Sequence, residues 1–149
     1  GLLSDAGCPG IADPGALLVA QAHREGIGVV PLVGPSSVAL ALMASGMNGQ
    51  GFAFHGYLPV KADARTAAIH HLEADSRRTG YAQIFIETPY RNGALLTALA
   101  ATCKPATRLC VAADITLPTE SVVSQTIGAW RGADGARYAK RPAIFVLQA

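Results

Sequence analysis

Apolar runs alternate with segments rich in glycine and proline over the first fifty residues, and they predict alternating strands and helices. Residues 27–33 (IGVVPLV) are almost continuously apolar, which is typical of a parallel strand covered on both faces. A short strand at 2–4 precedes a predicted helix that runs from Pro14 to about Glu25, with Asp13 as its N-cap. A second helix over 38–45 ends at Gly46. The order strand, helix, strand, helix predicts the tail of a doubly wound α/β layer.

A polar, glycine-containing segment at 47–51 predicts a linker to a second unit, of mixed α/β type. Apolar runs predict strands over 52–58, 83–87, 108–115 and 143–147. Helices are predicted over 62–78 and from 88 to about 103, a short strand or helix up to Trp130, and a turn at 132–137. We therefore expect two units, residues 1–48 and 52–149. Because the chain opens inside a predicted strand, we expect the first half of the first unit to be absent.

Composition excludes a disordered chain, since half of the 149 residues are hydrophobic and only 15% are charged. A net charge of +2 neither demands nor forbids an anionic partner. The three cysteines, Cys8, Cys103 and Cys110, lack the spacing of a zinc or redox site, so we expect buried thiols in a reducing cytoplasm and no metal centre. No apolar stretch reaches the ~18–20 residues of a membrane span, so we expect no membrane association.

Three polar segments follow predicted strands, where ligands bind in open parallel sheets. Asp5 could accept from a ribose hydroxyl or an ammonium group, or it could cap its own turn. The turn at 34–37 could hold a polar or anionic ligand at a helix N-terminus, or one of its serines could be a plain N-cap. Glu87 lies either at the rim of a cleft or in an ion pair with Arg91.

Two further features have both a functional and a structural interpretation. His55 could be a general base near neutral pH, or a hydrogen-bonded histidine within its strand. Basic residues in the second half could form a rim that binds nucleic acid, or they could be solvated faces: Arg77, Arg78, Arg131, Arg137, Lys140 and Arg141.

Five motifs in order carry a resemblance to the tetrapyrrole methylase superfamily, and within it to the branch of ribosomal RNA small-subunit methyltransferase I. Residues 3–15 (LSDAGCPGIADPG) resemble the S-D-A-G-T-P-x-I-S-D-P-G stretch of that family, and 31–37 (PLVGPSS) resemble P-L-P-G-P-S-A. Residues 54–59 (FHGYLP) are similar to F-x-G-F-L-P, and 85–91 (FIETPYR) to F-Y-E-S-P-H-R. Ile115-Thr116 with Glu120 resemble the element L-T-K-x-x-E. Residues 140–144 (KRPAI) replace the usual K-G-E, which puts a 16S substrate in doubt.

The resemblance implies an S-adenosylmethionine-dependent methyltransferase that binds its cofactor in a cleft between two α/β domains, usually in a homodimer. It implies transfer of a methyl group to a hydroxyl oxygen, such as a ribose 2′-OH of RNA, with Glu87 and then Asp5 as candidate bases. The cofactor-binding residues that it implies are Asp5, Cys8, Gly10, Ser36, Ser37, Ile86 and Ala113. The implied substrate-binding residues are Tyr57, Arg65, Arg91 and Glu120. A methyltransferase for a tetrapyrrole-type small molecule, and a binding or dimerising module without activity, are the alternatives.

Overall fold

Strand β5 (Ala143–Gln148) lies at the centre of a five-stranded mixed sheet in a computed structural model that describes residues 1–3 and 7–149. The strand order is β1-β2-β5-β3-β4, in which β1 and β2 are parallel and the other neighbours antiparallel. The other strands are β1 (Phe52–Tyr57), β2 (Ala82–Ile86), β3 (Arg108–Ala113) and β4 (Ser121–Thr126). The predicted strands of the second unit are all present, and the segment before Trp130 forms both a strand and a short helix.

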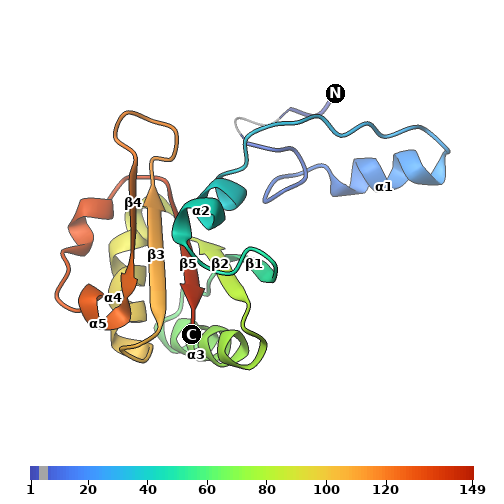
Figure 1. Cartoon of the computed structure of the whole chain (residues 1–149). Helices are drawn as coiled ribbons and strands as arrows, with labels where there is room; N and C mark the ends of the chain where they lie inside the picture. The colour runs from blue at the N-terminus through green and yellow to red at the C-terminus, as the bar shows by residue number, and fades with distance from the viewer. Residues whose placement is uncertain (4–6) are drawn as a thin grey trace.

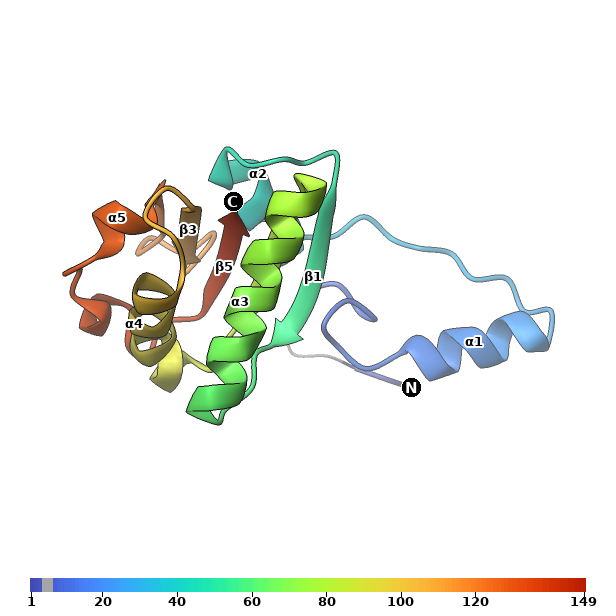
Figure 2. The same cartoon turned by 90° about the horizontal axis from the view of Figure 1, so that it is seen from below.

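Helices cover both faces of this sheet and make three layers (Figures 1 and 2). Helix α2 (Ser37–Ser45) packs on one face. The other face carries α3 (Ala62–Thr79), α4 (Asn92–Thr102) and α5 (Ile127–Trp130). Two 3₁₀ turns, η1 (Pro89–Arg91) and η2 (Gly135–Tyr138), adjoin α4. Because side chains alternate along a strand, the central strands contribute to both apolar clusters, which explains why they are apolar at nearly every position.

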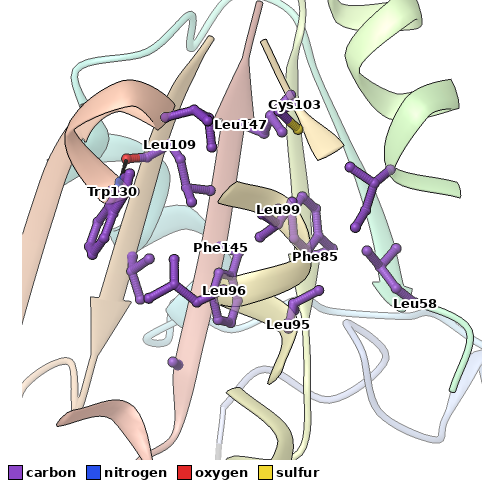
Figure 3. Close-up of a cluster of buried hydrophobic side chains, with 14 of the residues drawn as sticks. Leu58, Phe85, Leu95, Leu96, Leu99, Cys103, Leu109, Trp130, Phe145 and Leu147 are labelled. Carbon is purple, nitrogen blue, oxygen red and sulfur yellow. Dashed lines mark hydrogen bonds between the residues drawn. The ribbon is translucent and has the colours of Figure 1, made fainter. Parts of the chain in front are cut away.

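The larger core lies between the sheet and the α3–α4 layer (Figure 3). Phe85 of β2 and Phe145 of β5 stack there, with ring centroids 5.8 Å apart. Trp130 is buried at the edge of this core, and its indole Nε1 donates to the Leu109 carbonyl over 2.9 Å. The hydrogen bond satisfies the one polar atom of the indole ring, so α5 is fixed against β3 in a defined orientation.

The predicted strand at 27–33 is wrong. These residues follow α1 (Ala16–Arg24) as an extended segment outside the three layers (Figures 1 and 2). Val30 and Leu32 are 79% and 87% exposed, and α1 has no buried residue. A strand requires a neighbour that completes its hydrogen bonds, and no strand of the described residues lies beside 27–33.

Two smaller predictions near the N-terminus also differ. Helix α1 begins at Ala16 with Gly15 as its N-cap, so Asp13 and Pro14 precede the helix instead of opening it. Gly15 adopts a φ of 140°, which a residue with a side chain rarely adopts, and this sets the start of the helix. Of the predicted strand at 2–4, residues 2 and 3 are coil and residue 4 lies outside the described residues. None of the described helices is long and apolar enough to cross a membrane.

Candidate functional site

A cavity of about 490 Å³ lies where the N-terminus of α2 meets one end of the sheet. Its floor is formed by Ile86, Ile144 and Ala112, which are register partners on the adjacent strands β2, β5 and β3. Ser37 and Leu40 of α2 form a second side. The carboxyl ends of β2 and β3 therefore meet at this cavity, which is the usual place for a ligand in an α/β sheet.

Two loops complete the wall of the cavity. One is the connection between β3 and β4, which contributes residues 114–117, and the other is the approach to β5, which contributes Pro142 and Ala143. Asp114 and Arg141 join the two loops through an ion pair of 2.7 Å between Oδ2 and Nε. The hydrogen bond from Arg141 holds the pKa of the Asp114 carboxyl below its ordinary value, against a smaller opposing effect of burial.

The residues predicted to bind the cofactor fall into three groups. Ser37 and Ile86 line the cavity. Cys8 lies beside it, because its neighbour Gly7 is in the lining and its thiol donates to the Pro35 carbonyl over 3.2 Å. Ala113 does not line it, since the alternation along β3 turns Ala113 toward the α4 face while its neighbours Ala112 and Asp114 face the cavity.

The remaining predicted cofactor residues are Ser36, Gly10 and Asp5. Ser36 is the N-cap of α2 by position, but its side chain makes no capping hydrogen bond. Ser36 therefore occupies the N-cap position that one interpretation of the 34–37 turn predicted, but its hydroxyl group does not cap the helix. Gly10 is exposed, with a φ of 81°. Asp5 lies outside the described residues, so both interpretations of its carboxylate stay open.

Glu87 is buried and forms the ion pair that the sequence offered as its structural interpretation. Its Oε1 accepts from Arg91 Nη2 and Nε over 2.7 and 3.0 Å, and from the Thr88 amide over 2.6 Å. Its Oε2 is buried without a partner in the described part of the chain. Ile86 at the end of β2 lines the cavity, whereas Glu87 is not among the lining residues. The role of Glu87 as a catalytic base stays a prediction.

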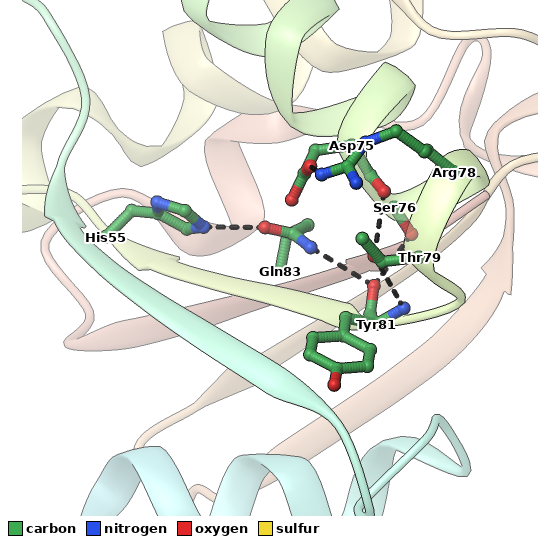
Figure 4. A network of polar contacts seen from close by, with 7 residues as sticks. All are labelled: His55, Asp75, Ser76, Arg78, Thr79, Tyr81 and Gln83. Atoms are coloured by element: carbon green, nitrogen blue, oxygen red, sulfur yellow. Dashed lines mark hydrogen bonds and ion pairs between the residues drawn. The ribbon is translucent and has the colours of Figure 1, made fainter.

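His55 is the hydrogen-bonded strand histidine of the second interpretation (Figure 4). Its Nε2 lies 2.6 Å from Oε1 of Gln83, whose amide nitrogen donates to the Tyr81 carbonyl over 3.2 Å. Because the amide nitrogen is used in this way, the oxygen faces His55, which must carry its proton on Nε2. The same network links α3 to β2 through Ser76, which donates to Tyr81 over 2.8 Å.

The four predicted substrate residues lie on different elements, and their role stays a prediction. Tyr57 is 62% exposed at the end of β1, and Arg91 lies in η1 beside Glu87. Arg65 is on α3, where its Nη1 lies 3.5 Å from the Val60 carbonyl. Glu120 lies in the connection between β3 and β4, and its Oε2 accepts from the Thr116 amide over 2.7 Å. Glu120 thus closes the β3–β4 loop beside the cavity.

The pairing of Asp114 with Arg141 is the feature of the site that sequence analysis did not find. Asp114 lies near the end of the predicted strand 108–115, and Arg141 lies in the KRPAI sequence. An acidic residue after an apolar strand is a signal for a site, but nothing local connects it to an arginine 27 residues later.

The described residues include two buried cysteine thiols that are protonated near neutral pH, and no group of side chains suited to a metal ion. Burial raises the pKa of the Cys103 thiol to about 12 and that of Cys110 to about 11, so both are protonated near neutral pH. Cys8 is half-buried, unlike the prediction of a buried thiol. Within residues 1–3 and 7–149, no group of three or more histidine, cysteine or acidic side chains could hold a metal ion.

Comparison with known proteins places this fold in a class. The chain superposes on the methyltransferase CobJ with a TM-score of 0.61 and 19% identity, over 95% of this chain and 61% of the other. The uroporphyrin-III C-methyltransferase of Thermus thermophilus, complexed with S-adenyl homocysteine, gives a TM-score of 0.50 and 18% identity over 95% and 62%. No family model matches the chain. The fold is therefore that of the tetrapyrrole methylases.

Sequence similarity narrows the class. The chain is 39% identical over 126 residues to the ribosomal RNA small subunit methyltransferase I of Neisseria meningitidis serogroup B, and 40% identical to that of Xylella fastidiosa. Each alignment covers 85% of this chain but only 42% and 45% of the respective relative. These findings confirm the resemblance of the chain to the tetrapyrrole methylase superfamily. Within that superfamily, the chain resembles the branch of ribosomal RNA small-subunit methyltransferase I. The chain spans less than half the length of these relatives.

Proposed function

We propose that the chain is part of an S-adenosylmethionine-dependent methyltransferase that methylates a ribose 2′-OH of ribosomal RNA. The observation that carries the proposal is the cavity at the α2 N-terminus, to which two separate recognised motifs contribute Ser37 and Ile86. The names of the relatives support methyl transfer and a ribosomal RNA substrate, and S-adenyl homocysteine in the Thermus thermophilus structure supports the cofactor. The ribose 2′-OH rests on the family resemblance alone.

The residues of the cavity suit this cofactor. A volume of about 490 Å³ is in the range of sites for small ligands. Leu40, Ile86 and Ile115 offer an apolar surface for a purine ring, while Ser37 and the amide groups at the start of α2 offer polar partners. When bound, S-adenosylmethionine supplies an electrophilic methyl group, which leaves sulfur as the hydroxyl oxygen attacks. The protein aligns the two reactants and accepts the hydroxyl proton.

Glu87 and Asp5 are the candidate groups for that proton. The buried, unpartnered Oε2 of Glu87 supports a role beyond its ion pair, whereas the absence of Glu87 from the cavity lining argues for the ion pair alone. Glu87→Gln and Asp5→Asn separate the candidates. Loss of a true base lowers kcat by about 10²-fold or more at unchanged cofactor affinity, while a residue of purely structural role leaves kcat near that of the unaltered enzyme.

We further propose that residues 1–48 are the C-terminal portion of a cofactor domain, and that 52–149 form the second domain of the cleft. The exposed apolar side chains of the extended segment support this, since such a surface on a soluble protein marks an interface. Titration of S-adenosylhomocysteine into this chain, and into a version extended at its N-terminus to the length of its relatives, tests the proposal. Equal affinities would contradict it.

The same exposed segment is compatible with a binding or dimerising module, and the titration also distinguishes this alternative. A homodimer in the cytoplasm is the assembly and location that we propose for the extended protein, in line with the family resemblance. Sedimentation of the extended protein should give the mass of two chains. A single-chain mass would remove the homodimer from the proposal without affecting the reaction.

RNA as the substrate is supported by exposed aromatic side chains beside β1 and β2. Tyr57 ends β1, and Tyr90, 80% exposed, follows the parallel strand β2. Tyrosine rings on a surface are platforms on which unpaired bases stack. Tyr57→Ala and Tyr90→Ala should each raise the KM for RNA several-fold and leave cofactor affinity unchanged. The exposed Tyr81, at the opposite end of β2, provides a matched control.

The decisive experiment uses the extended protein with S-adenosylmethionine labelled in its methyl group. Ribosomal RNA from cells that lack their own methyltransferase of this branch should become labelled, and nuclease digestion should recover the label on a 2′-O-methylated nucleoside. Label on a base would support the proposal of an RNA methyltransferase and refute its specificity for the ribose 2′-OH. Unlabelled RNA together with a labelled tetrapyrrole would favour the small-molecule alternative.

A further inference from the structure

Arg141 connects the two loops that wall the cavity. Its Nε donates to Asp114 Oδ2 over 2.7 Å, and its Nη2 donates to the Thr119 carbonyl over 2.6 Å. Its Nη1 lies 3.3 Å from the Arg137 carbonyl. A planar guanidinium group thus binds a carboxylate and two carbonyl groups at once, which a lysine could not reproduce.

The arginine is itself held in place. Its own carbonyl accepts from Nδ2 of Asn92 over 2.7 Å, and Asn92 is fully buried at the start of α4. Only 23% of the Arg141 side chain is exposed. The contacts therefore link the cavity wall to the helical layer on the other face of the sheet, and the position of Arg141 is determined by the core.

The β3–β4 loop requires such support, because its backbone conformation is an unusual one. Asp114 and Thr116 have φ values of 52° and 72°, and a β-branched residue such as Thr116 rarely adopts this region. Residues in these conformations persist when surrounding contacts hold them, and they gather at ligand sites. Here the contacts come from Arg141, from Glu120 and from the Pro142 carbonyl, which accepts from the Asp114 amide over 2.9 Å.

We propose that Arg141 is a positioning residue, which holds residues 114–120 as the wall of the cofactor cavity and thereby sets the affinity for the methyl donor. The inference rests on the proposed function. Arg141 is absent from the cavity lining, while its neighbour Pro142 and its partner Asp114 are present in it. Its effect on the ligand is therefore exerted through the loop, and the rate of methyl transfer does not depend on it.

The test compares Arg141→Ala and Arg141→Lys with Arg137→Ala in the extended protein. Arg137 is a matched control, because its guanidinium lies over the Tyr138 ring, 5.1 Å from the centroid, and it contacts Arg141 only through its backbone. Arg141→Ala should raise the KM for S-adenosylmethionine and the Kd for S-adenosylhomocysteine about tenfold, with kcat within about twofold of the unaltered enzyme. Arg141→Lys should restore part of the affinity, and Arg137→Ala should leave it unchanged.

Hydrogen exchange provides a readout that does not depend on the cofactor. In Arg141→Ala, the amides of 115–117, 119 and 120 should exchange faster, while those of β1 and α3 keep their rates. If the unaltered extended protein binds no S-adenosylhomocysteine but the loop responds in this way, the proposed function fails and the role of Arg141 in the loop stands. A variant with unchanged donor affinity and loop exchange, or with a lowered kcat at unchanged KM, overturns the inference.

Thr119→Val keeps the test valid if Arg141→Ala does not fold. It removes the hydrogen bond of 2.9 Å from Thr119 Oγ1 to Asp114 and leaves the arginine in place. A smaller rise in KM, again at unchanged kcat, is the expected result. No change in KM, together with unchanged loop exchange, would contradict the proposal.

Discussion

Arg91 binds Glu87 through two nitrogens of its guanidinium group, and both hydrogen bonds end on the same carboxylate oxygen. The Glu87 side chain is fully buried, whereas that of Arg91 is 36% exposed. The arginine is therefore the partner that offsets the cost of burying the carboxylate. The pair also closes the turn between β2 and η1, where the Thr88 amide donates to the same oxygen.

Arg91→Ala should lower the free energy of unfolding by about 2 kcal/mol, because it leaves the Glu87 charge buried and unpaired. The partial exposure of Arg91 keeps this estimate below that for a fully buried pair. Urea unfolding at neutral pH measures the loss. Arg78→Ala is the control, since its ion pair with Asp75 is on the surface of α3 and its removal should cost less than about 0.5 kcal/mol. Equal losses of unfolding free energy in the two variants would show that the buried ion pair stabilises the chain no more than the surface pair does.

Gly93 and Gly135 allow α4 and η2 to touch through their backbones. A Cβ atom on Gly93 would lie 3.1 Å from the Gly135 carbonyl oxygen, which belongs to backbone and cannot rotate away. Gly93→Ala should therefore reduce the free energy of unfolding by about 1–2 kcal/mol, although alanine favours a helix by about 1 kcal/mol.

Gly128→Ala is the matched control in a helix. The nearest atom to its added Cβ is at 3.4 Å, an ordinary contact, so stability should stay within about 0.5 kcal/mol of the unaltered chain. Thermal or urea unfolding of both variants makes the comparison. Gly93→Ala as stable as Gly128→Ala would show that the two segments can separate without loss.

The sequence was sufficient to predict β1, β2, β3 and β5, because each is an apolar run that packs inside its own unit. For the half-polar segment that forms β4 it left a strand and a helix open. It was not sufficient for 27–33, whose pattern indicates a strand but cannot supply the neighbour that a strand must pair with. At the candidate site, Ser37 and Ile86 lie in recognisable motifs and line the cavity, and their contact with the cofactor stays a prediction. The Ala113 side chain lies in the core beside α4 while Ala112 and Asp114 line the cavity, because successive side chains of a strand point to opposite faces.

The Asp114–Arg141 pair was beyond prediction for a different reason. Its members are joined only when β3 and β5 lie side by side in the sheet, with Ala113 opposite Ala143. The contact is therefore a consequence of strand order, which periodicity does not determine.

Thiol labelling should separate the three cysteines. Cys103 and Cys110 are buried, and their raised pKa values keep them protonated at pH 8. We expect Ellman's reagent to modify Cys8 alone in the folded chain and all three thiols in guanidinium chloride. Cys8→Ser should abolish the reaction of the folded chain. Rapid reaction of a second thiol would show that the sheet opens near β3 or α4.

The ion pair of Asp114 should make stability depend on acid pH. Its pKa is held below the ordinary value chiefly by the hydrogen bond from Arg141, so the folded state binds this proton less readily than the unfolded state. The stability that the carboxylate contributes is therefore present above the unfolded pKa of about 3.9 and is lost as pH falls through the folded pKa. Asp114→Asn removes the charge and keeps a residue type that tolerates a positive φ.

We expect the unaltered chain to be more stable than Asp114→Asn at pH 5 to 7, and the difference to shrink as the pH falls below about 4. Urea unfolding of both proteins at pH 7, 5, 4 and 3 measures it. Asp63→Asn is the control, because Asp63 is exposed in the first turn of α3 and does not contact Arg141. A difference that stays constant down to pH 3 would mean that Asp114 supports its loop by shape and hydrogen bonding alone, without its charge.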